Sequence, residues 1–181
     1  MRARLLVVAV IGLMMSLSAC SSLLGESAAA GAGANDADIV FLRDMLPHHQ
    51  QTLEISGLVG TRSKNAAVVE VANAITAEGS AEIDKMNGWL TEWKVGVTDS
   101  GHKAHEMVVA PKDVSVLGGY TGPQFDKQWS PLMVRHLQDG IKMAQDVESA
   151  GTHAGVKALA KEMITVQTGL VTKIEGTGAA A

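Results

Sequence analysis

The chain has 181 residues, of which 46% are hydrophobic and 3% aromatic, and its formal net charge is −4. An acidic chain of this kind argues against a nucleic-acid-binding surface, which needs clustered Lys and Arg. The single cysteine, Cys20, excludes an internal disulfide, and we expect any metal site in the folded part to do without thiolate ligands.

Residues 1–19 have the pattern of an export signal. Arg2 and Arg4 precede a short apolar run, residues 5–13, and Leu17-Ser18-Ala19-Cys20 follows it. The run is shorter than the ~20 apolar residues of a transmembrane helix. The tetrapeptide resembles a bacterial lipobox, in which cleavage leaves the cysteine as a lipidated N-terminus; an ordinary secretory signal is the alternative. We therefore expect an extracytoplasmic protein, anchored by lipid to the cell membrane or envelope.

The mature chain is more acidic than the precursor. Residues 1–19 contain two arginines and no acidic residue, so thirteen basic residues then stand against nineteen acidic ones, a net charge of −6. Residues 20–35 are mostly Ala, Gly and Ser and predict a flexible tether. Residues 36–175 suit one domain with one core, and residues 176–181 are expected to form a disordered tail.

Apolar residues at three- and four-residue spacing predict two helices in the first half of this domain. The first begins at Asn35 or Asp36, either of which is a plausible N-cap, and ends near Gly57. Pro47 lies inside it and is expected to bend it, because proline removes a backbone hydrogen bond. The second helix begins within residues 63–65 and ends near Gly96.

Two more helices are predicted in the second half, at about residues 124–149 and 154–174. The connection before them, residues 95–123, is longer than usual between neighbouring helices and has room for a short helical turn after Pro111. Strand-like alternation is absent from the sequence, so the fold class is all-α.

The two halves repeat each other at an offset of 88 residues. Met45-Leu46-Pro47-His48-His49-Gln50 aligns with Met133-Val134-Arg135-His136-Leu137-Gln138, and without a gap Ile75 aligns with Met163. Two copies of a helical hairpin would pack as a four-helix bundle.

The segment 45–50 is the first candidate for chemistry. On a helix, Met45, His48 and His49 lie within an arc of roughly 100° that also holds Phe41 and Thr52, so they face inward. Imidazole suits Cu(II), Cu(I) and Zn(II), and thioether sulfur favours Cu(I).

Four motifs occur together in this chain. They are Met-Leu-Pro-His-His-Gln in the first helix, a Met-containing connection, Phe125-Asp126, and Met-x-x-His in the third helix. Together they resemble the family called domain of unknown function 305, DUF305. The resemblance implies an exported, ferritin-like four-helix bundle, with some members linked to copper. It points to five ligands: Met45, His48, His49, Met133 and His136. Arg135 and Leu137 replace a proline and a second histidine that the family's second copy often has, which implies a reduced second half-site.

If the first and third helices meet, these five side chains offer a thiolate-free site for copper, with zinc as the second choice. The connection adds His102, His105 and Met107 as weaker candidates for a second or shared site.

A structural interpretation of the same residues stays open. Buried histidines can hold helices together through hydrogen bonds, for example from His48 to Asp44. The chain would then be a metal-free envelope scaffold or an interaction module. No enzymatic activity is expected, because the sequence has no Glu-x-x-His pair, as di-iron bundles need, and no hydrolase or phosphate-binding motif.

Overall fold

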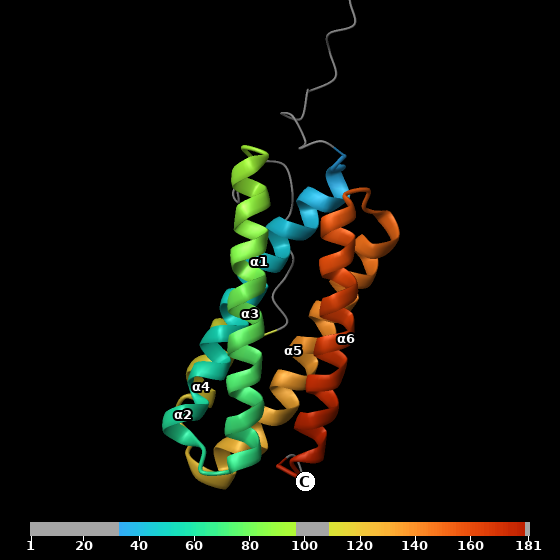
Figure 1. Cartoon of the computed structure of the whole chain (residues 1–181). Coiled ribbons are helices and arrows are strands. Elements are labelled where there is room, and N and C mark those ends of the chain that lie inside the picture. Colours follow the sequence, from blue (N-terminus) through green and yellow to red (C-terminus); the bar gives the residue numbers. More distant parts are fainter. Residues whose placement is uncertain (1–32, 97–108, 180–181) are drawn as a thin grey trace, which may run out of the picture.

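The computed structural model describes residues 33–96 and 109–179 (Figure 1). These residues form helices and connections and contain no strand. Four helices are long, namely α1 (Asp36–Gly57), α3 (Ala66–Glu92), α5 (Gly122–Ala150) and α6 (Ala154–Gly176). Two are short, namely α2 (Val59–Arg62) and α4 (Pro111–Leu117).

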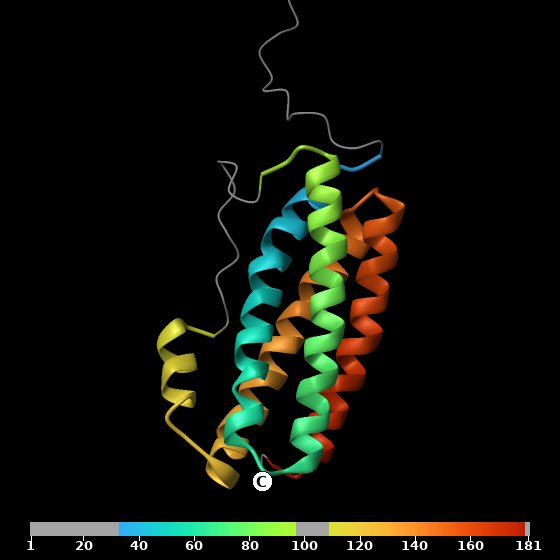
Figure 2. The ribbon, with the colours of Figure 1, turned by 60° about the vertical axis from the view of Figure 1, so that its left-hand side comes forward.

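The long helices form a four-helix bundle made of two hairpins. Helix α1 packs against α3 and α5 packs against α6, and the hairpins meet where α1 contacts α5 and α3 contacts α6. Helices α1 and α6 run in one direction and α3 and α5 in the other, as both views show (Figures 1 and 2). The predicted all-α bundle of two hairpins is therefore confirmed. None of the described helices is long and apolar enough to cross a membrane.

The helix caps support the repeat offset that the sequence predicts. Asn65 caps α3, because its side chain accepts hydrogen bonds from the backbone of Ala67 and Val68. His153 caps α6, and its Nδ1 accepts from the backbone of Val156. The two caps lie 88 residues apart, so the second helix of each hairpin begins at the same place in the repeat.

Several helix ends differ from the prediction by a few residues. Helix α3 ends at Glu92 rather than near Gly96, and Lys94 just beyond it takes a φ of 56°. Helix α5 begins at Gly122, because Pro123 occupies its first turn, where the backbone needs no N–H donor. Pro111 begins α4 in the same way. Helix α1 continues through Pro47 without a break.

Asp38 fastens the start of α1 to the turn between α5 and α6. Asn35 and Asp38 form a capping box, and Asp38 Oδ2 also accepts from the backbone N–H groups of Thr152 and His153, each at 3.0 Å. Burial raises the pKa of this carboxyl, but the backbone hydrogen bonds from Asn35, Thr152 and His153 outweigh it, so the net pKa lies below its ordinary value.

The apolar core has two parts, which we name after their methionines. The Met45 cluster lies toward the start of α1, and the Met133 cluster lies toward its end. The Met45 cluster includes Leu42, Met45, Met86, Trp93, Val156 and Met163. The Met133 cluster includes Ile55, Ile75, Phe125, Trp129, Met133 and Leu170.

Several predicted features lie outside the described residues. They are the signal segment, Cys20, most of the tether, and the weaker ligand candidates His102, His105 and Met107.

Candidate metal centre

His48 of α1 and His136 of α5 meet where the two hairpins cross. Their rings stack with centroids 3.9 Å apart and planes within 2°. Nε2 of His48 lies 3.1 Å from the backbone oxygen of His136, and Nε2 of His136 lies 3.2 Å from that of His48. Both side chains are buried. A carbonyl can only accept, so each imidazole donates from Nε2 to the other helix.

A hydroxyl group fixes His136 further. Thr52 Oγ1 donates to the backbone oxygen of His48 and lies 2.9 Å from Nε2 of His136, from which it accepts. The proton is therefore on Nε2, and Nδ1 of His136 keeps its lone pair. Within the described part of the chain, this Nδ1 is buried without a hydrogen-bond partner. Burial lowers the pKa of His136 to about 4, although the hydrogen bond to His48 opposes the shift, so the ring is neutral at pH 7.

His49 points to the other helix of its own hairpin. Its Nε2 lies 2.5 Å from Oε2 of Glu82 on α3, and both side chains are buried. The carboxylate accepts, so Nε2 carries the proton and Nδ1 keeps a lone pair that has no hydrogen-bond partner among the described residues. Metal-binding histidines usually have this form, in which one nitrogen is held by a carboxylate or carbonyl and the other binds the ion.

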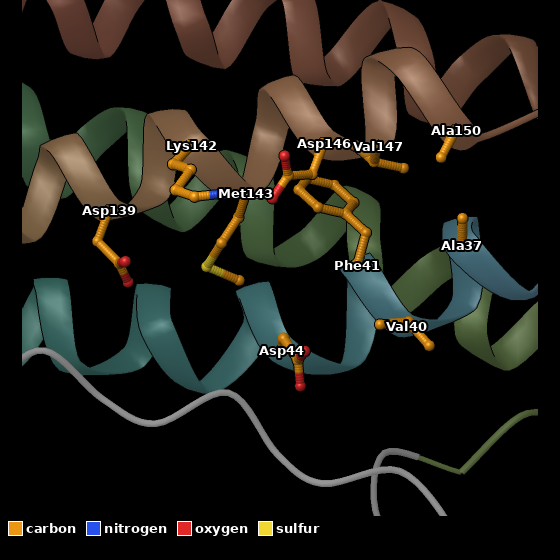
Figure 3. A pocket seen from close by; sticks show the side chains of 10 residues that line it. All are labelled: Ala37, Val40, Phe41, Asp44, Asp139, Lys142, Met143, Asp146, Val147 and Ala150. Carbon is orange, nitrogen blue, oxygen red and sulfur yellow. Dashed lines mark hydrogen bonds and ion pairs between the residues drawn. The ribbon is translucent and has the colours of Figure 1, made fainter.

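A second carboxylate connects His48 with the surface. Asp139 Oδ2 lies 3.7 Å from Nε2 of His48, and Asp139 also lines a cavity of about 320 Å³ between α1 and α5. Figure 3 shows Met143 pointing from α5 toward α1 in this cavity, between Asp139 and Phe41. Asp44, the carboxylate that the sequence suggested for His48, lines the same cavity.

The two methionines do not join one ligand set. Met45 and Met133 are both fully buried, but each belongs to its own cluster, on opposite sides of the stacked histidines. Because α1 and α5 are antiparallel, residues that precede His48 and His136 diverge from the crossing point. Met45 nevertheless stays beside His48 and His49, which follow it by three and four residues on one face of α1.

The five predicted ligands therefore divide into a stacked pair, a histidine bound to Glu82, and two separate methionines. Across residues 33–96 and 109–179, no group of three or more His, Cys, Asp or Glu side chains is arranged to hold a metal ion. The donor chemistry still fits a soft or borderline ion, because His49 and His136 present buried Nδ1 lone pairs and Met45 adds a thioether beside His49.

Three neighbours of this centre were not predicted from the sequence. Glu82 binds His49, and Gln167 of α6 is buried close to His48. Gly140 of α5 permits this approach, since a Cβ there would lie 3.0 Å from Cε1 of His48. The sequence contained a weak indication of Glu82, because this acidic residue lies on the mostly apolar side of its predicted helix.

Comparisons with known proteins assign the chain to a family. The model of the domain of unknown function DUF305 matches residues 38–177. A search of curated proteins found none that matches.

Solved structures share the fold. A DUF305 protein from Streptomyces coelicolor, described as secreted, has 27% identity and a TM-score of 0.72 over 76% of this chain and 89% of its own. A DUF305 fragment from Deinococcus radiodurans has 24% identity and a TM-score of 0.72 over 80% and 97%. CopM in its Cu(II)-bound form has 21% identity and a TM-score of 0.66 over 77% and 93%. With the family model covering the whole bundle, the chain belongs to the DUF305 family.

Proposed function

We propose that this chain is an extracytoplasmic copper-binding or copper-buffering protein, tethered to the membrane by lipid on Cys20. Its role is to bind the ion rather than to catalyse a reaction. His48, His49 and His136 supply nitrogen and Met45 supplies a thioether to Cu(I), whereas Met133 lies in the opposite cluster and stays outside the ligand set.

The observation that carries the proposal is the orientation of the buried imidazoles. His49 is held through Nε2 by Glu82, and His136 is held through Nε2 by Thr52 and the backbone of His48. Each therefore keeps a buried Nδ1 lone pair, which is costly to bury without a partner. A metal ion is a partner that such a nitrogen accepts.

Two of the structural relatives support the copper assignment and the location. CopM has been solved with Cu(II), with Cu(I) and with silver bound. At about a fifth identity this likeness concerns the fold, so the ligands are inferred from the residues of this chain. The Streptomyces coelicolor relative is described as secreted.

Metal titration of residues 20–181 tests the proposal. Cys20→Ser should be present in every sample, so that the thiol does not bind copper itself. We expect one Cu(I) or Cu(II) ion to bind with submicromolar affinity, and zinc to bind more weakly. His48→Ala/His49→Ala should lose this binding while its circular dichroism spectrum stays helical. An unchanged affinity in the double variant would exclude this site.

His102→Ala/His105→Ala provides a second comparison. If copper binds chiefly through the connection, this variant and not the helix variant will lose it.

The alternative function is a metal-free scaffold or interaction module of the envelope. The reciprocal hydrogen bonds between His48 and His136 favour it, because they join the hairpins without any ion. A parent that binds neither copper nor zinc would decide for this alternative. The lipid anchor has its own test, since globomycin should cause the unprocessed precursor to accumulate and Cys20→Ser should abolish that effect.

A further inference from the structure

The buried pair of His49 and Glu82 has an apolar counterpart in the second half of the chain. At the repeat offset of 88 residues, His49 corresponds to Leu137 and Glu82 corresponds to Leu170. Both leucines are buried and belong to the Met133 cluster. Where the first hairpin has a hydrogen-bonded polar pair, the second has two leucines.

The correspondence holds in the structure as well as in the alignment. His49 lies on α1 and Leu137 on α5, each of which is the first long helix of its hairpin. Glu82 and Leu170 both lie seventeen residues after the helix caps, Asn65 and His153. The same place in the hairpin thus holds a polar pair in the first half of the chain and two leucines in the second half.

This comparison shows that the hairpin does not need a polar pair at this place. Burying a carboxylate and an imidazole costs solvation free energy, and replacing such a pair with apolar residues is often neutral or stabilising. Glu82 is 6% exposed and His49 2% exposed, so the solvation cost applies to both. Because packing does not require His49 and Glu82 to be polar, we look for a role of this pair other than stabilising the fold.

We infer that Glu82 is a positioning residue for the proposed copper site. It holds Nε2 of His49, so that Nδ1 is presented to the ion, and its negative charge balances part of the charge of the bound cation. The inference rests on the proposed function. At this place in the repeat, it gives the first hairpin a role in binding and leaves Leu137 and Leu170 of the second hairpin with a packing role.

The first test is Glu82→Gln, compared with Glu78→Gln. The glutamine oxygen still accepts from Nε2 of His49, but the charge is lost. We expect the copper affinity of Glu82→Gln to fall about 10- to 100-fold, with a changed Cu(II) electron paramagnetic resonance spectrum. Glu78 is exposed one turn earlier on α3, so Glu78→Gln removes the same charge and should keep the parent's affinity and spectrum.

The second test copies the chemistry of the second hairpin into the first. His49→Leu/Glu82→Leu should fold and unfold at a temperature no lower than the parent, while it loses the copper site. Glu82→Leu alone should unfold at a lower temperature, because His49 then has no partner for Nε2. These opposite effects separate a pair kept for binding from a pair kept for stability.

Three outcomes would overturn the inference. The first is a Glu82→Gln protein with the parent's copper affinity and spectrum. The second is a double leucine variant that unfolds well below the parent, which would make the pair structural. In either case the proposed function stands as long as His48→Ala/His49→Ala loses copper. The third is a parent that binds no copper, which removes the proposed function and this inference together.

Discussion

His48 and His136 are joined by two hydrogen bonds that mirror each other, each from an imidazole Nε2 to the backbone oxygen of the other histidine. The stacked rings lie at the crossing of α1 and α5, between the two halves of the core. This contact joins the two hairpins. Protonation or substitution of either histidine should therefore change the free energy of unfolding of the whole bundle.

Acid should destabilise the fold through His136. Burial lowers the pKa of His136 to about 4, against 6.5 for the unperturbed group, so the unfolded chain takes up a proton first as the pH falls. The stabilising contribution is complete above about pH 6.5 and is lost between about pH 6.5 and 4. At ~1.4 kcal/mol per pKa unit, the loss is about 3 kcal/mol. Urea unfolding at a series of pH values measures it.

His136→Gln is the control for the acid effect. Carboxyl groups titrate in the lower part of the same range, so only the difference between the two proteins reports on His136. The variant should be less stable at pH 7 but lose less stability on acidification. Identical slopes for both proteins would contradict the prediction.

Gly140 should resist substitution, although it lies inside a helix. The added Cβ of Gly140→Ala would lie 2.8 Å from Oε1 of Gln167 and 3.0 Å from Cε1 of His48. The Gln167 side chain can move, but the stacked His48 ring cannot, so we expect a loss of about 1 to 3 kcal/mol in the free energy of unfolding. Gly88→Ala in α3 meets nothing within 4 Å and should gain about 0.5 to 1 kcal/mol. Equal effects at the two positions would show that the close approach of α5 to His48 and Gln167 does not restrict the residue at position 140.

Asp38 should contribute more to stability than its neighbour Asp36. Asp38→Ala removes the acceptor of backbone N–H groups from Asn35, Thr152 and His153, and we expect a loss of about 3 kcal/mol, measured by urea unfolding. Asp36 is exposed in the same first turn, so Asp36→Ala should cost at most about 1 kcal/mol. A similar loss in both variants would mean that Asp38 acts only through the helix dipole.

The two methionines of the repeat should differ in their effect on copper. Met45→Leu should lower Cu(I) affinity and affect Cu(II) less, because Met45 lies beside His48 and His49 and its sulfur prefers Cu(I). Met133→Leu should leave both affinities unchanged, because Met133 lies in the opposite cluster. Both variants should stay within about 1.5 kcal/mol of the parent in stability, since leucine has a similar volume. Competition with a Cu(I) chelator measures the affinities. An equal loss of affinity in the two variants would contradict the placement of Met45 and Met133 on opposite sides of the stacked histidines.

Much of the fold follows from local signals. Apolar spacing predicted the four long helices, Asn35 was one of two expected caps, and Pro111 marked the start of α4. The offset of 88 residues predicted that His48 and His136 are equivalent, and the structure brings them together. These predictions succeed because they depend on period and on capping chemistry, which are properties of a few neighbouring residues.

The composition of the site depends on how the helices turn relative to one another. The sequence does not show that antiparallel crossing separates Met45 from Met133, or that Glu82 of α3 faces His49. Such pairings are fixed by the rotation of each helix about its axis, to which distant core residues contribute. The repeat itself held one clue, since Leu137 and Leu170 are apolar where His49 and Glu82 are polar.

The two kinds of histidine contact have different evolutionary consequences. His48 and His136 each bond to a backbone oxygen, which is present whatever the side chain, so a substitution at one position leaves the bond made by the other. His49 and Glu82 are joined side chain to side chain, so losing either one leaves a buried polar group behind. Among homologues, positions 49 and 82 should therefore change together, whereas these hydrogen bonds do not by themselves couple the side chains at positions 48 and 136.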